Sequence, residues 1–154
     1  LMGHDPFVPA NDPAWKALGV ESRELDAMLP ETDILSVHVP LTNGTRGLLG
    51  AKRLAMLPAG ACIINTARGG VIDYAALATE LKSGRLGGAA LDVFEKEPLP
   101  APNGFEGVPN LLLTPHIAGV TKDSNQRVSQ LTAENVLRFL RGEKPSVPDA
   151  AASA

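Results

Sequence analysis

Cysteine is almost missing from this sequence: Cys62 is the single one in 154 residues. That scarcity excludes an internal disulfide and a cysteine-rich metal site, so we expect no bound metal. Cys62 lies in an apolar run, which favours a buried thiol over a nucleophile. No apolar run approaches the length of a membrane span, and the N-terminus lacks a signal-peptide pattern. We therefore expect a cytosolic protein.

An excess of basic residues is missing too. The formal net charge is -3, and Lys and Arg are scattered without forming a stripe, which argues against nucleic acid as a partner. The length is sufficient for one domain with a hydrophobic core. The apolar and charged fractions are those of a soluble globular protein.

What the sequence does contain is an alternation of short apolar runs with helical patterns. Strands are expected at 1–3, 20, 33–40, 61–66, 87–93 and 110–115, and helices at 12–18, 22–29, 50–57, 73–83 and 121–141. This alternation predicts an α/β fold with a parallel sheet covered on both faces. We expect the runs at 87–93 and 110–115 to be buried strands. One domain should span 1–144, and a disordered tail 145–154.

Polar residues stand where the predicted strands end. They are His4 and Asp5, His38 shortly before Pro40, Thr66 and Arg68, Asp92, and His116. Ligands of parallel α/β sheets bind outside the carboxyl ends of the strands, so this edge is the candidate site. We expect His4 and His38 to be structural. Asp5 has two interpretations of equal weight, a ribose-binding acid of a dinucleotide fold or an ordinary Asp-Pro turn.

Arg68 and His116 have the side chains best suited to chemistry. A guanidinium at a strand end can bind a carboxylate through two parallel hydrogen bonds, and Gly69 and Gly70 let the chain turn behind it. The alternative for Arg68 is an ordinary surface arginine. His116 can shuttle a proton when a carboxylate lies close by. Asp92 either caps the following turn or accepts a hydrogen bond from a ligand.

Four stretches together resemble one known family. They are "DILSVHVPLTNGTRGLLG", "PAGACIINTARGGVIDYAAL", "GGAALDVFEKEPLP" and "NLLLTPHIAGVT", and they resemble the D-isomer-specific 2-hydroxyacid dehydrogenases, the family of phosphoglycerate dehydrogenase and glyoxylate/hydroxypyruvate reductase. The resemblance runs from about Leu1 to about Gly142. It implies a Rossmann-like, doubly wound sheet, NAD as cofactor, and hydride transfer between nicotinamide C4 and C2 of a small 2-hydroxy or 2-oxo acid.

The resemblance also implies roles for individual residues. Arg68 would anchor the substrate carboxylate, His116 would be the acid/base, and Glu97 rather than Glu95 would pair with His116 and stabilise its imidazolium. The cofactor-binding residues implied are Asp5 at the adenosine ribose, Val39, Pro40 and Thr45 along the adenine side, Thr66, Ala67 and Arg68 near the nicotinamide ribose, Asp92 at the carboxamide, and His116 and Gly119 beside the cofactor.

One feature of the family is missing. A dinucleotide fold carries G-x-G-x-x-G about 20 residues before its ribose acid, and the printed sequence starts at Leu1, four residues before Asp5. We therefore expect a chain without the first strand-turn-helix and without the substrate domain, roughly the C-terminal half of a homodimeric subunit. An alternative is a transcriptional corepressor of the same fold, which binds NAD as a conformational ligand. Formate dehydrogenase ranks third.

Overall fold

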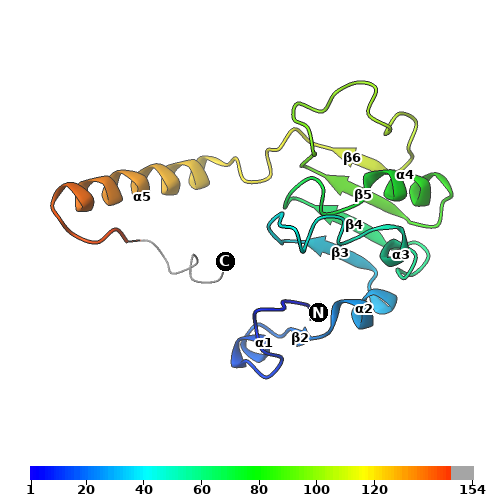
Figure 1. Ribbon diagram of the computed structural model, residues 1–154, viewed down its shortest axis with the longest axis horizontal. Helices are drawn as coiled ribbons and strands as arrows, with labels where there is room; N and C mark the ends of the chain where they lie inside the picture. Colours follow the sequence, from blue (N-terminus) through cyan, green and yellow to red (C-terminus); the bar gives the residue numbers. More distant parts are fainter. Residues whose placement is uncertain (147–154) are drawn as a thin grey trace. The chain divides into compact units, whose positions relative to one another are not determined.

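The computed structural model describes residues 1–146, so the predicted tail lies outside the described residues from 147 onward. The chain divides into two compact units, Leu1–His116 and Ile117–Ala154. The predicted domain 1–144 therefore extends over both. The first unit contains the strands β1 to β6, and the second contains the helix α5 (Figure 1).

A four-stranded parallel sheet forms the centre of the first unit. Its strands are β3 (Ile34–Val37), β4 (Cys62–Asn65), β5 (Gly88–Leu91) and β6 (Leu111–Leu113), and they lie side by side in that order (Figure 1). Val37 is in register with Asn65, and Asn65 with Leu91. The carboxyl ends of these four strands therefore share one edge, as the sequence predicted, but the strand that ends at His4 and Asp5 belongs to a separate sheet.

A second, two-stranded parallel sheet holds β1 (Met2–Gly3) and β2 (Glu21–Ser22). The helix α1 (Pro13–Ala17) connects these two strands. The predicted strand at 20 thus begins one residue later. Within the described residues, β1 and β3 each have a strand neighbour on one side alone.

Side-chain caps begin the longer helices where the sequence indicated. Asp12 accepts a hydrogen bond from the Ala14 amide at the start of α1, and Asp73 accepts from the Ala75 and Ala76 amides at the start of α4 (Tyr74–Lys82). Two helices are shorter than predicted, namely α2 (Leu25–Met28), which continues as a 3-10 turn over Leu29–Glu31, and α3 (Ala51–Leu54). Among residues 1–146, none of the helices is both long and apolar enough to cross a membrane.

The core lies on one face of the four-stranded sheet. The buried side chains of this face, Leu35, Val37, Ile63, Ala89 and Leu91, pack in one cluster with Leu54 of α3 and with Leu77 and Leu81 of α4. Burying one such leucine contributes about 1.5–3 kcal/mol.

Within the first unit, helices cover one face of the sheet and leave the opposite face exposed, so the first unit by itself provides the expected cover on one face. Ile34 is 65% exposed and Leu112 62% exposed, because α3 and α4 pack on the other side. The predicted buried strand at 110–115, which forms as β6, is therefore largely exposed. The predicted buried thiol of Cys62 is also wrong, since this residue is partly exposed on the same face.

The second unit consists of α5 (Lys122–Leu140), close to the predicted 121–141. Thr121 begins it by accepting a hydrogen bond from the Ser124 amide, and Ser146 donates its amide to the Asn135 side chain after it ends. The helix is amphipathic as expected, yet none of its described residues is buried.

Candidate active site

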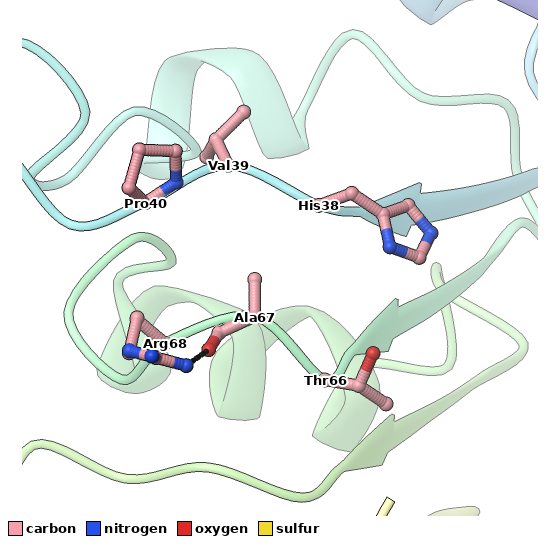
Figure 2. A pocket seen from close by; sticks show the side chains of 6 residues that line it. All are labelled: His38, Val39, Pro40, Thr66, Ala67 and Arg68. Carbon is pink, nitrogen blue, oxygen red and sulfur yellow. Dashed lines mark hydrogen bonds between the residues drawn. The ribbon is translucent and has the colours of Figure 1, made fainter. Parts of the chain in front are cut away.

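The segments that leave β3 and β4 form a first hollow of about 300 Å³ between them. Its lining consists of His38, Val39 and Pro40 from one segment and Thr66, Ala67 and Arg68 from the other. Figure 2 shows the two segments running side by side, with His38 and Thr66 toward one end and Pro40 and Arg68 toward the other. This arrangement follows from the parallel register that places Val37 beside Asn65.

Five of the residues predicted to bind cofactor thus meet in the first hollow. His38 was expected to be structural, but it is exposed and lines the hollow with them. Its Nε2 atom lies 2.8 Å from the Ser36 hydroxyl oxygen. His38 is a cofactor-side candidate that sequence reasoning set aside, although its place at a strand end signalled it.

A second hollow of about 340 Å³ brings the three predicted catalytic residues together. Arg68, Glu97 and His116 all line it, and Arg68 lines the first hollow as well. The other lining residues are Leu41, Arg46, Gly69, Val93, Phe94 and Glu95. The segments that follow β3, β4, β5 and β6 therefore all contribute to one site at the carboxyl edge of the sheet.

His116 and Glu97 form a hydrogen-bonded pair. The Nδ1 atom of His116 lies 2.7 Å from Oε2 of Glu97, and the Phe94 amide donates to Oε1 of Glu97 at 2.8 Å. The His116 hydrogen bond, and after it the Phe94 amide, lower the pKa of Glu97. Glu97 is therefore charged at neutral pH and holds the imidazole through Nδ1. The other ring nitrogen, Nε2, points away from Glu97 and can contact a ligand.

The backbone of His116 adopts an unusual conformation. Its φ angle is 56°, in the left-handed region that residues other than glycine rarely occupy. Such angles cluster at functional sites, where the surrounding structure holds them. At this position the conformation directs the imidazole of a residue beyond β6 toward Glu97, which lies beyond β5.

Arg68 extends into solvent, and its guanidinium has spare donors. One nitrogen, Nη1, donates to the Ala67 carbonyl oxygen at 2.6 Å. The remaining donors have no partner within residues 1–146, and the same holds for the whole guanidinium of Arg46, which also lines the second hollow. Two guanidinium groups can therefore receive an anionic ligand there.

The glycine pair behind Arg68 has the role that the sequence suggested. Gly70 has φ of +83°, which glycine adopts without steric cost. Gly69 is buried against the backbone of Phe94 and Glu95. The turn thus places Gly69 in the lining of the second hollow.

Asp5 lies in an exposed turn, where its Oδ1 atom accepts a hydrogen bond from the Phe7 amide at 2.9 Å. The turn interpretation is therefore observed, while ribose binding stays a prediction. Thr45 donates its hydroxyl to the Pro40 carbonyl at 2.6 Å and so closes the loop that follows β3. Neither Asp5 nor Thr45 lines a hollow.

Asp92 is buried just beyond β5, and its Oδ1 atom accepts a hydrogen bond from the Thr114 hydroxyl at 2.5 Å. The bond links the ends of β5 and β6. Asp92 lines neither hollow, so its contact with the carboxamide stays a prediction. Gly119 belongs to the second unit, and its role also stays a prediction.

Sequence reasoning missed two residues that build the site. Asn65 is 0% exposed at the end of β4, and Tyr74 begins α4 beside it. Asn65 donates to the Tyr74 hydroxyl at 2.9 Å and to the Arg68 carbonyl at 3.0 Å. The available signal was the polar Asn65 at the end of an apolar strand, followed closely in the sequence by the single tyrosine.

Comparisons with known proteins agree with this arrangement. The model of the family "D-isomer specific 2-hydroxyacid dehydrogenase, NAD binding domain" matches residues 1–118. The chain is 51% identical to (S)-sulfolactate dehydrogenase of Chromohalobacter salexigens over 91% of its own length and 45% of that protein. It is 46% identical to glyoxylate reductase of Thermofilum pendens over 82% of its length and 37% of that protein.

A solved structure gives the same result for the fold. The D-isomer specific 2-hydroxyacid dehydrogenase of Xanthobacter autotrophicus, in complex with NADPH and MES, matches with a TM-score of 0.76 and 38% identity, over 94% of this chain and 58% of that one. The chain thus spans less than half of the two curated relatives. A family model that covers 118 of 154 residues, the Rossmann-type sheet and the site at its carboxyl edge together identify the chain as a member of the D-isomer-specific 2-hydroxyacid dehydrogenase family, from its NAD-binding domain.

Proposed function

We propose that the full-length protein is an NAD-dependent oxidoreductase that interconverts a D-2-hydroxy acid and the corresponding 2-oxo acid. The observation that carries the proposal is the second hollow, where Arg68 lies with the His116–Glu97 pair. A carboxylate-binding group and an acid/base group in one hollow suit a substrate with a carboxylate next to a carbonyl or hydroxyl.

Each of these side chains has a distinct task in the reduction. Arg68 binds the substrate carboxylate through its free donors and draws electron density from the adjacent carbonyl. His116, protonated, donates a proton from Nε2 to the carbonyl oxygen, and takes it back in the reverse direction. Glu97 holds Nδ1 and stabilises the imidazolium. Proton transfer by a positioned group contributes roughly 10²–10⁴-fold to the rate.

The first hollow suits the cofactor. It lies at the carboxyl ends of adjacent parallel strands, where such sheets bind dinucleotides, and small uncharged side chains make up most of its lining. NAD, when bound, supplies the hydride chemistry. We propose that Val39, Pro40, Thr66 and Ala67 hold it, with Arg68 at the border of both hollows.

We propose further contacts from the predicted residues outside the hollows. Asp5 would accept hydrogen bonds from the ribose, Thr45 would shape the adenine side, and Asp92 and Gly119 would lie near the nicotinamide. The resemblance to the family supports these roles, a homodimeric full-length enzyme and a location in the cytosol.

A turnover assay tests the proposal on the full-length enzyme. NADH oxidation is followed with glyoxylate, hydroxypyruvate and sulfopyruvate, for wild type and for His116→Ala. We expect wild type to reduce at least one of them and His116→Ala to lose nearly all turnover while retaining NADH binding. NADH binding without turnover of any 2-oxo acid would contradict an enzymatic function and favour the corepressor-like alternative. None of the relatives described above is named as a corepressor.

A further inference from the structure

Asn65 is the buried polar side chain at the site that the proposed roles leave unused. It makes three hydrogen bonds, and both of its N–H donors are used. Its Oδ1 atom accepts from the Ala67 amide at 3.0 Å, and its Nδ2 atom donates to the Arg68 carbonyl and to the Tyr74 hydroxyl. One side chain therefore fixes the backbone on both sides of Arg68, the segment that borders both hollows.

Tyr74 continues this network toward the other half of the site. Its hydroxyl accepts from Asn65 and donates to the Val93 carbonyl oxygen at 2.7 Å. Burial raises the pKa of Tyr74 to about 12, so the hydroxyl keeps its proton at working pH. The ring packs against Phe94 and Phe105, with centroids 6.3 and 5.5 Å away.

Val93 begins the segment that holds the acid/base pair. The next residue, Phe94, donates its amide to Glu97, and Glu97 binds His116. An unbroken series of hydrogen bonds and one peptide unit thus runs from the Arg68 backbone through Asn65 and Tyr74 to the support of Glu97.

We infer that Asn65 and Tyr74 are positioning residues that set the carboxylate-binding Arg68 and the Glu97–His116 pair relative to each other. The inference rests on the proposed function for the roles of those three residues. A tyrosine that serves stability alone would bond to any nearby carbonyl. Here both bonds of the hydroxyl end on segments that carry the chemistry, 65–68 and 93–97, and the strand ladder between them ends with the bond from the Asp92 amide to the Asn65 carbonyl oxygen.

The test compares Tyr74→Phe with Thr32→Val in the full-length enzyme. Both variants keep the shape of the side chain and remove one hydroxyl-to-carbonyl bond. Tyr74 is half-buried, and Thr32 is buried on a different part of the fold, where it donates to the Met28 carbonyl at 2.7 Å. We expect Tyr74→Phe to lower kcat/KM roughly 3- to 10-fold, with changes in both kcat and KM, and Thr32→Val to leave both unchanged. Equal kinetics in the two variants would overturn the inference.

Amide hydrogen exchange provides a readout that does not need turnover. In Tyr74→Phe, peptides covering 66–70 and 93–97 should both exchange faster, because the Tyr74 hydroxyl no longer holds Asn65, the acceptor of the Ala67 amide, or Val93, next to the Phe94 amide, while Thr32→Val leaves both unchanged. Faster exchange in one segment alone, or in neither, would overturn the inference. Failure of the proposed function is a different result: wild type that reduces no 2-oxo acid, whatever the exchange shows.

Discussion

The backbone of Gly69 passes so close to that of Phe94 that a Cβ atom at position 69 would lie 2.1 Å from the Phe94 carbonyl carbon. This contact joins the turn behind Arg68 to the segment that holds Glu97. The glycine after the arginine is therefore required by packing, and its neighbour Gly70 by its positive φ.

Gly69→Ala should damage both stability and activity. The added methyl group must displace backbone, which costs about 1–3 kcal/mol of unfolding free energy, and it pushes the 94–97 segment away from His116. Denaturant unfolding and steady-state kinetics of the full-length enzyme measure the two effects. Gly50→Ala is the matched control, because a Cβ there meets nothing closer than 3.5 Å. A Gly69→Ala enzyme with wild-type kcat/KM would refute this role.

Arg68→Lys should impair the full-length enzyme nearly as much as Arg68→Ala. Lysine keeps the charge but loses the planar pair of donors that a carboxylate needs. Steady-state kinetics with the best 2-oxo acid decide the point, and kcat/KM should fall in both variants. If the lysine variant retains most of the wild-type value, Arg68 attracts the substrate by charge alone.

Reduction should slow above a certain pH, and Glu97→Gln should lower that pH, because the imidazolium of His116 loses its carboxylate. Glu95→Gln should change little, since Glu95 lines the second hollow but makes no hydrogen bond to His116. The pH dependence of kcat/KM is the measurement. The opposite pattern, a shift with Glu95→Gln alone, would mean that the other carboxylate is the partner.

The lowered pKa of Glu97 also predicts a pH dependence of stability. Because the folded state holds the charged form, the contribution of Glu97 is fully present above the ordinary carboxyl value of 4.5 and is lost as the pH falls through the lowered folded value. The difference in Tm between wild type and Glu97→Gln should therefore shrink in acid.

Asp5 should make the enzyme prefer NAD over NADP. A carboxylate accepts hydrogen bonds from ribose hydroxyls and repels the additional phosphate. Asp5→Ser should narrow the preference, while the serine hydroxyl can still accept from the Phe7 amide and keep the turn. The ratio of kcat/KM with NAD to kcat/KM with NADP tests this prediction. A wild-type preference for NADP would contradict ribose binding by Asp5.

The sequence predicted the sheet and the site edge because those depend on local patterns. Short apolar runs that alternate with helices predict parallel strands, and the polar residues after them collect at one edge. Contacts between distant segments left no such pattern. The exposure of Leu112 depends on which face α3 and α4 cover, and the bond from Tyr74 to Val93 depends on how the start of α4 packs against the loop after β5.

The position of Asn65 illustrates the same limit. Its type and its place at a strand end indicated a polar terminus, but not that the side chain turns inward and binds the Arg68 backbone. Likewise, the sequence predicted that Arg68 follows the end of a strand. That Pro40 and Arg68 lie toward the same end of the first hollow depends on the register of β4 with β3.

The last prediction concerns the 154-residue chain by itself, which should bind NAD far more weakly than the full-length protein and catalyse no reduction. The sequence contains no G-x-G-x-x-G, and a pyrophosphate needs backbone amides at a helix N-terminus that glycines bring close. In the described residues, β1 and β3 also end their sheets with unpaired edges, which favour association with another chain.

Calorimetry with NAD, on the chain and on the full-length protein in parallel, measures this difference directly. An NADH-linked assay with glyoxylate and hydroxypyruvate accompanies it, and light scattering reports association through the open edges of β1 and β3. We expect the full-length protein to bind at micromolar concentration and the chain to show little heat, because Val39, Pro40, Thr66 and Ala67 hold one part of the cofactor and leave the pyrophosphate without partners. Micromolar binding with turnover by the monomeric chain would show that these residues suffice without a glycine-rich loop.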